Sequence, residues 1–393
     1  MTERTHATRR QVLATLVAFA TFGSFWGAWG ASIPRIRDQA GVDEGQLGLA
    51  LLCVGLGALP AMLLVGRALD RLGLRLAAYT IASLGIAGVV VTLGARSFET
   101  LAAGLAVVGM ASGAADVAMN AVAGRAEQDA GRPIITRAHG MLSGFVVIGS
   151  LGAASVAALD LPLVLPFLVV GAASLVAAAA MVRALPAGRI EVEESHAEAV
   201  AAAGGLRGAA LMPLLLVGTL GALAFASESA HQNWSAIFAR DVLDAGHGQA
   251  ALAPALFAAV VSAARLAIGG LGAAHAQVVL VAGGIAAAVG SLIVSTADGA
   301  GVFVTGLVVA ASGTAVLFPT VLGIVSRTVM ESRRGRATSL VTTVAYLGFL
   351  LGPAYVGAWA DAYDLRVAMV AVAALAGSMA LLTPVLLRLA MSK

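Results

Sequence analysis

Long apolar stretches alternate with short polar segments along the chain, and this pattern recurs twelve times between residues 12 and 390. Each stretch has about 20 residues or more, the length that a helix needs to cross ~30 Å of hydrocarbon. None alternates with the period of two that a strand of a membrane barrel requires. Backbone groups cannot stay unpaired in lipid, so the pattern predicts membrane-spanning helices. The predicted spans cover residues 12–33, 46–66, 76–95, 98–123, 138–158, 162–185, 210–239, 249–270, 277–296, 300–327, 337–360 and 366–390.

The composition agrees with a helical membrane protein, because 60% of the residues are apolar, only 11% are charged and 47 are glycine. The single cysteine, Cys53, excludes an intramolecular disulfide and a cysteine-based metal site. No nucleotide-binding motif, haem site or catalytic nucleophile is recognisable. We therefore expect neither an enzyme nor an ATP-driven pump, and no metal or other cofactor.

The basic residues predict an orientation in the membrane. With both termini in the cytoplasm, 19 arginines and lysines fall on the inner side and five on the outer side. Basic residues favour cytoplasmic loops, so this split predicts cytoplasmic termini. The basic character thus reflects topology, and no nucleic-acid partner is expected. The inner set includes Arg265, and the outer set is Arg35, Arg37, Arg96, Arg240 and Arg366.

A ten-residue motif, GRALDRLGLR, joins the second and third predicted spans. It matches the pattern G-x-x-x-D-R-x-G-x-R at Gly66, Asp70, Arg71, Gly73 and Arg75. The glycines would permit close approach and a tight turn, and Asp70 with the arginines could form a charge-paired latch. An ordinary basic loop is the alternative. With the twelve spans, the motif resembles the loop signature of the major facilitator superfamily, a family of membrane carriers. The resemblance implies a cytoplasmic gate at these five residues.

Weak internal similarity at an offset near 204 residues indicates two related halves. Gly144-Phe145 recurs as Gly348-Phe349, and residues 29–35 resemble residues 234–240. The resembled family has two six-helix halves related by an axis along the membrane normal. We therefore expect an N-terminal half at residues 1–185, a solvated cytoplasmic linker at residues 186–209 and a C-terminal half at residues 210–393.

Two acids fall well inside predicted spans: Asp116 in the fourth and Glu228 in the seventh. An acid at the centre of a membrane helix costs about 2.5–3.5 kcal/mol, so each should face a cavity or a partner. Burial away from cations favours the protonated form of a carboxyl group. We therefore predict that Asp116 and Glu228 are proton-coupling residues; a structural protonated acid is the alternative for each.

Polar and aromatic neighbours of these acids are candidate substrate contacts. Asn120 follows Asp116 by one helical turn, while Glu228, His231, Gln232 and Ser235 form one helical stripe that we expect to line the central cavity. His231 could titrate near neutral pH or remain a neutral hydrogen-bond donor. Trp26 and Trp29 could form either an interfacial belt or a platform for a ring. The predicted substrate-binding residues are Asn120, His231, Gln232, Asn233, Trp234, Trp26, Trp29 and Tyr346.

Four longer segments resemble a bacterial subgroup around the rhizopine-associated MosC protein, which is distantly similar to the fucose–proton symporters. They cover residues 29–52, 116–140, 228–243 and 346–368. The fucose carriers have a fourth-span acid followed by an asparagine, as do Asp116 and Asn120 here. Their first-span acid has no counterpart in residues 12–33, and Glu228 would supply the second acid instead. In drug–proton antiporters the fourth span usually carries an arginine where Leu105 stands, which weakens that alternative.

These features predict an all-helical carrier in the bacterial cytoplasmic (inner) membrane, working as a monomer. Its expected function is proton-coupled transport of a small polar, sugar- or inositol-like solute by alternating access. Drug or metabolite efflux by proton antiport is one alternative, and an uncoupled facilitator or a sensor with the carrier fold is another. The expected partners are the solute, protons and the lipid bilayer.

Overall fold

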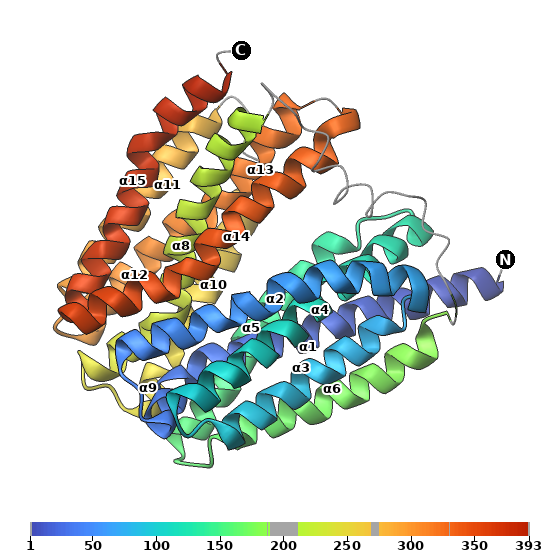
Figure 1. Ribbon diagram of the computed structural model, residues 1–393, viewed down its shortest axis with the longest axis horizontal. Coiled ribbons are helices and arrows are strands. Elements are labelled where there is room, and N and C mark those ends of the chain that lie inside the picture. The colour runs from blue at the N-terminus through green and yellow to red at the C-terminus, as the bar shows by residue number, and fades with distance from the viewer. Residues whose placement is uncertain (1, 187, 189–210, 269–274, 330, 392–393) are drawn as a thin grey trace. The chain divides into compact units, whose positions relative to one another are not determined.

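The computed structural model describes residues 2–391 except for residues 187, 189–210, 269–274 and 330. Within these ranges the chain is helical, with short turns between the helices (Figure 1). The predicted linker lies almost wholly outside the described residues. The helices are α1 (Thr2–Ala40), α2 (Glu44–Leu72), α3 (Leu76–Gly94), α4 (Phe98–Ala130), α5 (Ile135–Ala158), α6 (Val164–Ala184), α8 (Leu211–Asp241), α9 (His247–Ala250), α10 (Leu252–Ile268), α11 (Ala276–Ser295), α12 (Ala300–Ala315), α13 (Leu317–Thr328), α14 (Glu331–Ala362) and α15 (Leu365–Met391).

The prediction of twelve spans is confirmed for the described part of the chain. Twelve helical segments there are long and apolar enough to cross a membrane, and each coincides with one predicted span. Two of these spans are interrupted: α9 and α10 form the eighth, and α12 and α13 form the tenth. The protein is therefore an all-helical, multi-pass membrane protein.

The chain divides into two compact units, each described by itself here. Unit 1 comprises Met1–Glu193 with Gly246–Ala255, and unit 2 comprises Glu194–Ala245 with Leu256–Lys393. In unit 1, α1 packs on α5 and α3 packs on α6; in unit 2, α8 packs on α14 and α11 packs on α15. These are the same pairs of helices if the seventh to twelfth spans repeat the first to sixth. The matching pairs support the internal repeat.

Glycines set the closest contacts inside each unit. In unit 1, Gly27 of α1 lies against the backbone of Val146 on α5, and in unit 2, Gly348 of α14 lies against Ala222 on α8. Small residues permit such approach because no side chain separates the two backbones. Gly144, the sequence counterpart of Gly348, instead has nothing within 4 Å of its Cβ position.

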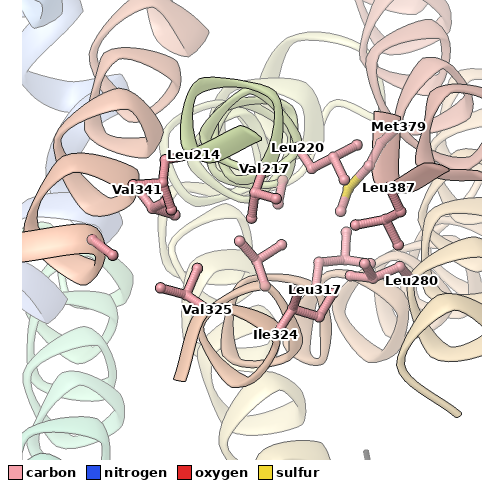
Figure 2. Close-up of a cluster of buried hydrophobic side chains, with 13 residues drawn as sticks. Leu214, Val217, Leu220, Leu280, Leu317, Ile324, Val325, Val341, Met379 and Leu387 are labelled. Atoms are coloured by element: carbon pink, nitrogen blue, oxygen red, sulfur yellow. The ribbon is translucent and has the colours of Figure 1, made fainter. Parts of the chain in front are cut away.

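A buried apolar cluster holds α8, α11, α13, α14 and α15 together in unit 2 (Figure 2). The side chains come from three to four turns of α8 and from the facing sides of the other helices, so they fix how α8 is turned. The cluster contains Leu214, Val217, Leu220, Ala224, Leu280, Leu317, Val321, Ile324, Val325, Ala337, Val341, Met379 and Leu387. The cluster ends at Ala224 on α8, one turn before Glu228, so the polar residues from Glu228 onward make other contacts.

Gly109→Val should destabilise the protein strongly, whereas Gly124→Val on the same helix should not. A Cβ at Gly109 would collide with the backbone carbonyl of Val54 on α2, and backbone yields less readily than a side chain. Overpacking of this kind costs about 1–3 kcal/mol or more. At Gly124 nothing lies within 4 Å of the Cβ position. Retention of a monodisperse gel-filtration peak after heating would measure the difference, and equal losses for both variants would contradict the packing account.

Candidate functional site

A break in the tenth span frees a backbone carbonyl inside unit 2. Helix α12 ends at Ala315 and α13 begins at Leu317. Pro319 stands four residues after Ala315 and has no N–H, so it cannot donate the helical hydrogen bond that the Ala315 carbonyl would otherwise accept. The Nε of Arg265, from α10, donates to that carbonyl at 3.1 Å instead.

The same arginine binds the buried acid of the seventh span. Arg265 Nη2 donates to both carboxylate oxygens of Glu228, at 3.1 Å to Oε1 and 2.9 Å to Oε2. The Glu228 side chain is 8% exposed, whereas that of Arg265 is 39% exposed. The carboxylate therefore occupies the inner side of the pair, and the guanidinium is its accessible end. We call Arg265, Glu228 and the Ala315 carbonyl the arginine site.

The arginine site corrects one sequence-based interpretation. Arg265 lies in the last turn of α10, 13 residues after the start of that helix, and Glu228 lies 13 residues before the end of α8. Both are roughly 20 Å from those helix ends at 1.5 Å per residue, so they meet at similar depth. Glu228 is therefore not an acid remote from cations.

Amide side chains extend the polar surface of α8. Gln232 Nε2 donates to Glu228 Oε1 at 3.2 Å, and Asn233 Nδ2 donates to the Ser229 carbonyl at 2.8 Å. Ser229 in turn donates through its hydroxyl to the Phe349 carbonyl of α14 at 3.1 Å. Gln232 and Asn233 are both partly exposed, so the structure leaves them accessible as candidate substrate contacts.

His231 faces the interior of unit 2 rather than a cavity. It is 1% exposed, stacks on Phe257 of α10 with ring centroids 5.4 Å apart, and lies 2.9 Å from the Ser291 hydroxyl through Nε2. Ser291 already donates to the Ala287 carbonyl, so its oxygen must accept the hydrogen bond from His231. This geometry favours the neutral Nε2–H ring. Ser235 is buried as well, so the predicted cavity-lining stripe is only partly exposed, at Gln232.

An aromatic cluster that the sequence interpretation missed lies beside the arginine site. Phe225 of α8 is 4.1 Å from Phe318 of α13 between ring centroids, 5.7 Å from Tyr346 and 6.1 Å from Phe349 of α14. All four rings are partly exposed. Phe225 precedes Glu228 by three residues, about one helical turn. Of this cluster the sequence predicts only Tyr346, as a substrate contact. The i, i+3, i+7 spacing of Phe225, Glu228 and Gln232, which places them on one side of α8, could have indicated Phe225 as well.

The tryptophans differ in their exposure. Trp29 and Trp234 are 2% and 0% exposed, so they are enclosed by other side chains in this conformation. Trp29 packs edge-on to Phe167 of α6, and Trp26, which is partly exposed, packs edge-on to Phe22 and Phe25. Of the three, only Trp26 offers surface to a solute here.

Asp116 has a different environment from Glu228. It is partly buried on α4, and its carboxylate accepts a hydrogen bond from Asn120 Nδ2 at 3.2 Å, while Asn120 also donates to the Asp116 carbonyl at 2.9 Å. No ion pair among the described residues involves Asp116. The nearest basic residue along α4, Arg125, instead pairs with Asp129 at 3.1 Å. The two acids therefore differ in their partners: Glu228 forms an ion pair with Arg265, whereas Asp116 accepts a hydrogen bond from Asn120.

The loop motif is only partly explained by its predicted roles. Gly73 has a φ of +78° and lies against the backbone of Gly188, which agrees with the predicted turn and close approach at this glycine. Gly66 has nothing within 4 Å of its Cβ position, so close approach stays a prediction there. Arg75 Nε donates to the Leu185 carbonyl at the end of α6 at 3.0 Å. No ion pair between described residues includes Asp70 or Arg71.

The chain is similar to known proteins over most of its length. The family model described as Major Facilitator Superfamily matches residues 14–275 and 249–392. An uncharacterised MFS-type transporter of Yersinia pestis is 27% identical over 376 residues, covering 93% of each chain. The uncharacterised transporter y4wD of Sinorhizobium fredii is 27% identical over 372 residues, covering 94% of this chain and 96% of the relative.

Solved structures share the same fold. The nucleoside transporter NupG superposes with a TM-score of 0.76 at 14% identity, covering 97% of this chain and 98% of that chain. A bacterial homologue of the human lysosomal transporter Spinster gives a TM-score of 0.74 at 15% identity, covering 95% of this chain and 96% of that chain. At such identities the likeness concerns the fold.

Proposed function

Because the chain belongs to the Major Facilitator Superfamily, a family of transporters and not of enzymes, we propose that it is a proton-coupled secondary active transporter of a small polar solute. Alternating access between two halves would carry the solute across the membrane. The observation that carries the proposal is Asp116: an acid in the fourth span with an amide partner and no ion pair among the described residues.

Asp116 would be one residue that binds and releases a proton. A charged acid in a closed and poorly hydrated cavity is costly, and proton binding removes that charge. Asn120 can donate to the carboxylate in either protonation state, so it orients Asp116 without fixing its charge. Glu228 would take a second role, because Arg265 already compensates its charge.

The partly exposed polar residues would contact the solute. Asn120, Gln232 and Asn233 offer amide donors and acceptors, which suit a sugar- or inositol-like solute with several hydroxyls. Tyr346 and its aromatic neighbours would supply a face for the solute's ring. The similarity to NupG is a reason to include a nucleoside among the test solutes.

A test that separates the candidate functions uses purified protein in vesicles with a pH-sensitive dye inside. Addition of myo-inositol, L-fucose or uridine outside should acidify the interior as solute enters, which is the signature of symport. Interior alkalinisation would indicate the antiport alternative. Solute entry without any pH change would identify an uncoupled facilitator. No entry of these neutral solutes or of a carboxylate such as D-glucuronate would favour a sensor.

The same proposal places both termini in the cytoplasm of a bacterium, with the protein in the inner membrane as a monomer. The unequal distribution of basic residues supports this orientation. Asp70 and Arg71 would then belong to a cytoplasmic gate with Gly66, Gly73 and Arg75.

Cysteine labelling in intact cells should confirm this orientation. In a Cys53→Ser background, Asp43→Cys should react with an impermeant maleimide from outside, and Arg132→Cys should react only after the membrane is opened. Both positions are exposed in the structure, so accessibility to the reagent depends on the side of the membrane. The reverse pattern would overturn the proposed orientation.

A further inference from the structure

The hydrogen bonds of Arg265 leave one side of its guanidinium available. Nε donates to the Ala315 carbonyl and Nη2 donates to Glu228. Each guanidinium carries five N–H donors, so the two N–H groups of Nη1 lie beyond these bonds. The side chain is 39% exposed, and a guanidinium facing hydrocarbon would be costly, so its exposed part should face water.

A solute that reaches this point meets a cation and aromatic rings before it meets the acid. Glu228 is the buried member of the pair, and Phe225 lies one turn away on the same helix. Phe318 follows the Ala315 carbonyl by three residues and contacts Phe225. A guanidinium next to aromatic surface suits a molecule with a carboxylate and a flat or apolar body.

We propose that the arginine site binds an organic carboxylate, and that a proton on Glu228 is the condition for that binding. The proposal rests on the proposed proton-coupled transport and names the chemical class of its solute. While Glu228 is ionised, it neutralises Arg265 and repels a second carboxylate. Once the Glu228 carboxylate accepts a proton, Arg265 retains an uncompensated charge, which is costly in a partly buried place.

An arriving carboxylate removes that cost by taking the place of the ionised Glu228. Proton and anion therefore bind together, and neither is favoured alone. A neutral sugar offers no charge to compensate Arg265 and gains nothing from the protonation of Glu228. The pair thus selects for the acid over its uncharged analogue. The backbone carbonyl freed by Pro319 keeps Arg265 in place while its partner changes.

Matched pairs of small molecules test this inference. Thermal stabilisation of the purified protein would be measured with benzoate and benzamide, D-glucuronate and D-glucose, and lactate and lactamide. The buffers would be mildly acidic and mildly alkaline, and all three acids stay ionised in both. At least one carboxylate should stabilise the wild type, roughly tenfold more tightly in the acidic buffer, while its neutral partner should not.

Variants assign the effect to the two residues. Glu228→Gln imitates the protonated acid, so it should bind the carboxylate with wild-type strength or better and with no dependence on pH. Arg265→Gln should lose the stabilisation. If either single variant does not fold, Arg265→Lys is measured in its place. Lysine keeps the positive charge but lacks the planar guanidinium, so Arg265→Lys should bind the carboxylate more weakly and still depend on pH. Arg366→Gln, which removes an exposed ion pair with Asp298, is the matched control and should bind as the wild type does.

The inference is overturned if no carboxylate stabilises the wild type, or if the Arg265 variants bind as the wild type does. Failure of this inference can be distinguished experimentally from failure of the proposed function. Proton-coupled entry of a neutral solute with no carboxylate binding would contradict only the inference. Carboxylate binding that depends on Glu228, without any proton movement in vesicles, would contradict the proposed coupling and leave the inference standing.

Discussion

Arg265→Gln should lower the melting temperature of the purified protein more than Glu228→Gln does, although both variants remove one member of the same ion pair. The Glu228 side chain is 8% exposed, and among the described residues only the Gln232 amide would remain as a donor to its buried carboxylate. Breaking a buried pair from one side costs about 3–5 kcal/mol. The Ala315 carbonyl would lose its Arg265 donor as well.

Glu228→Gln should cost less than Arg265→Gln, because the Arg265 side chain that it leaves behind is 39% exposed and its charge is only partly desolvated. The double variant Glu228→Gln/Arg265→Gln leaves no unpaired charge and should be more stable than Arg265→Gln alone.

The exposed ion pair of Arg366 with Asp298 provides the control. Its nitrogen–oxygen distance is 2.7 Å, shorter than that between Arg265 and Glu228, but the Asp298 side chain is 88% exposed, against 8% for Glu228. Exposed pairs contribute about 0–1 kcal/mol, so Asp298→Asn should leave the melting temperature nearly unchanged. If Glu228→Gln and Arg265→Gln lowered it equally, or no more than this control, Arg265 would not be compensating a buried charge.

The number and placement of the spans could be predicted from sequence because they depend on local composition. A run of about 20 apolar residues must form a helix in lipid wherever it occurs in the chain. Local spacing also explains why Arg125 is no partner of Asp116, because the two residues are nine positions, roughly 13 Å, apart along one helix, and Arg125 pairs with Asp129 instead.

The arginine site could not be predicted in the same way. Glu228 and Arg265 are 37 residues apart and on different helices, and a third helix supplies the carbonyl that holds Arg265. Near the end of an apolar run, Arg265 looked like an ordinary basic residue of a cytoplasmic loop. Pro319 was visible in the sequence, but the donor that replaces its missing N–H depends on tertiary packing.

The polar residues on one side of α8 differ in their exposure, which the periodicity of the sequence could not predict. Helical spacing places Glu228, His231 and Gln232 on one side of the helix, but it does not tell which neighbour covers each side chain. Phe257 and Ser291 enclose His231, while Gln232 stays partly exposed. For the same reason Gly66 and Gly73 look alike in the motif, yet only Gly73 has a close backbone neighbour.

Asp116→Asn should abolish proton-driven accumulation of the transported solute while leaving solute exchange nearly intact. Asparagine has the shape of aspartate, and its side-chain oxygen can still accept the hydrogen bond from Asn120, so the fold and the solute site should be preserved. It cannot bind and release a proton in the working range of the carrier. Asp129→Asn on the same helix is the control, because that carboxylate already pairs with Arg125.

The decisive measurement compares accumulation and exchange in the same vesicles, loaded with a solute that the wild-type protein carries. With a proton gradient imposed, the wild type and Asp129→Asn should concentrate the solute. Asp116→Asn should bring the solute only to equal concentrations on both sides. Its exchange rate should stay within about twofold of the wild-type rate, a difference in activation free energy well under the 1.4 kcal/mol that corresponds to a tenfold change. Concentration of the solute by Asp116→Asn, with an unchanged dependence on the gradient, would contradict the assignment of Asp116 as the proton site.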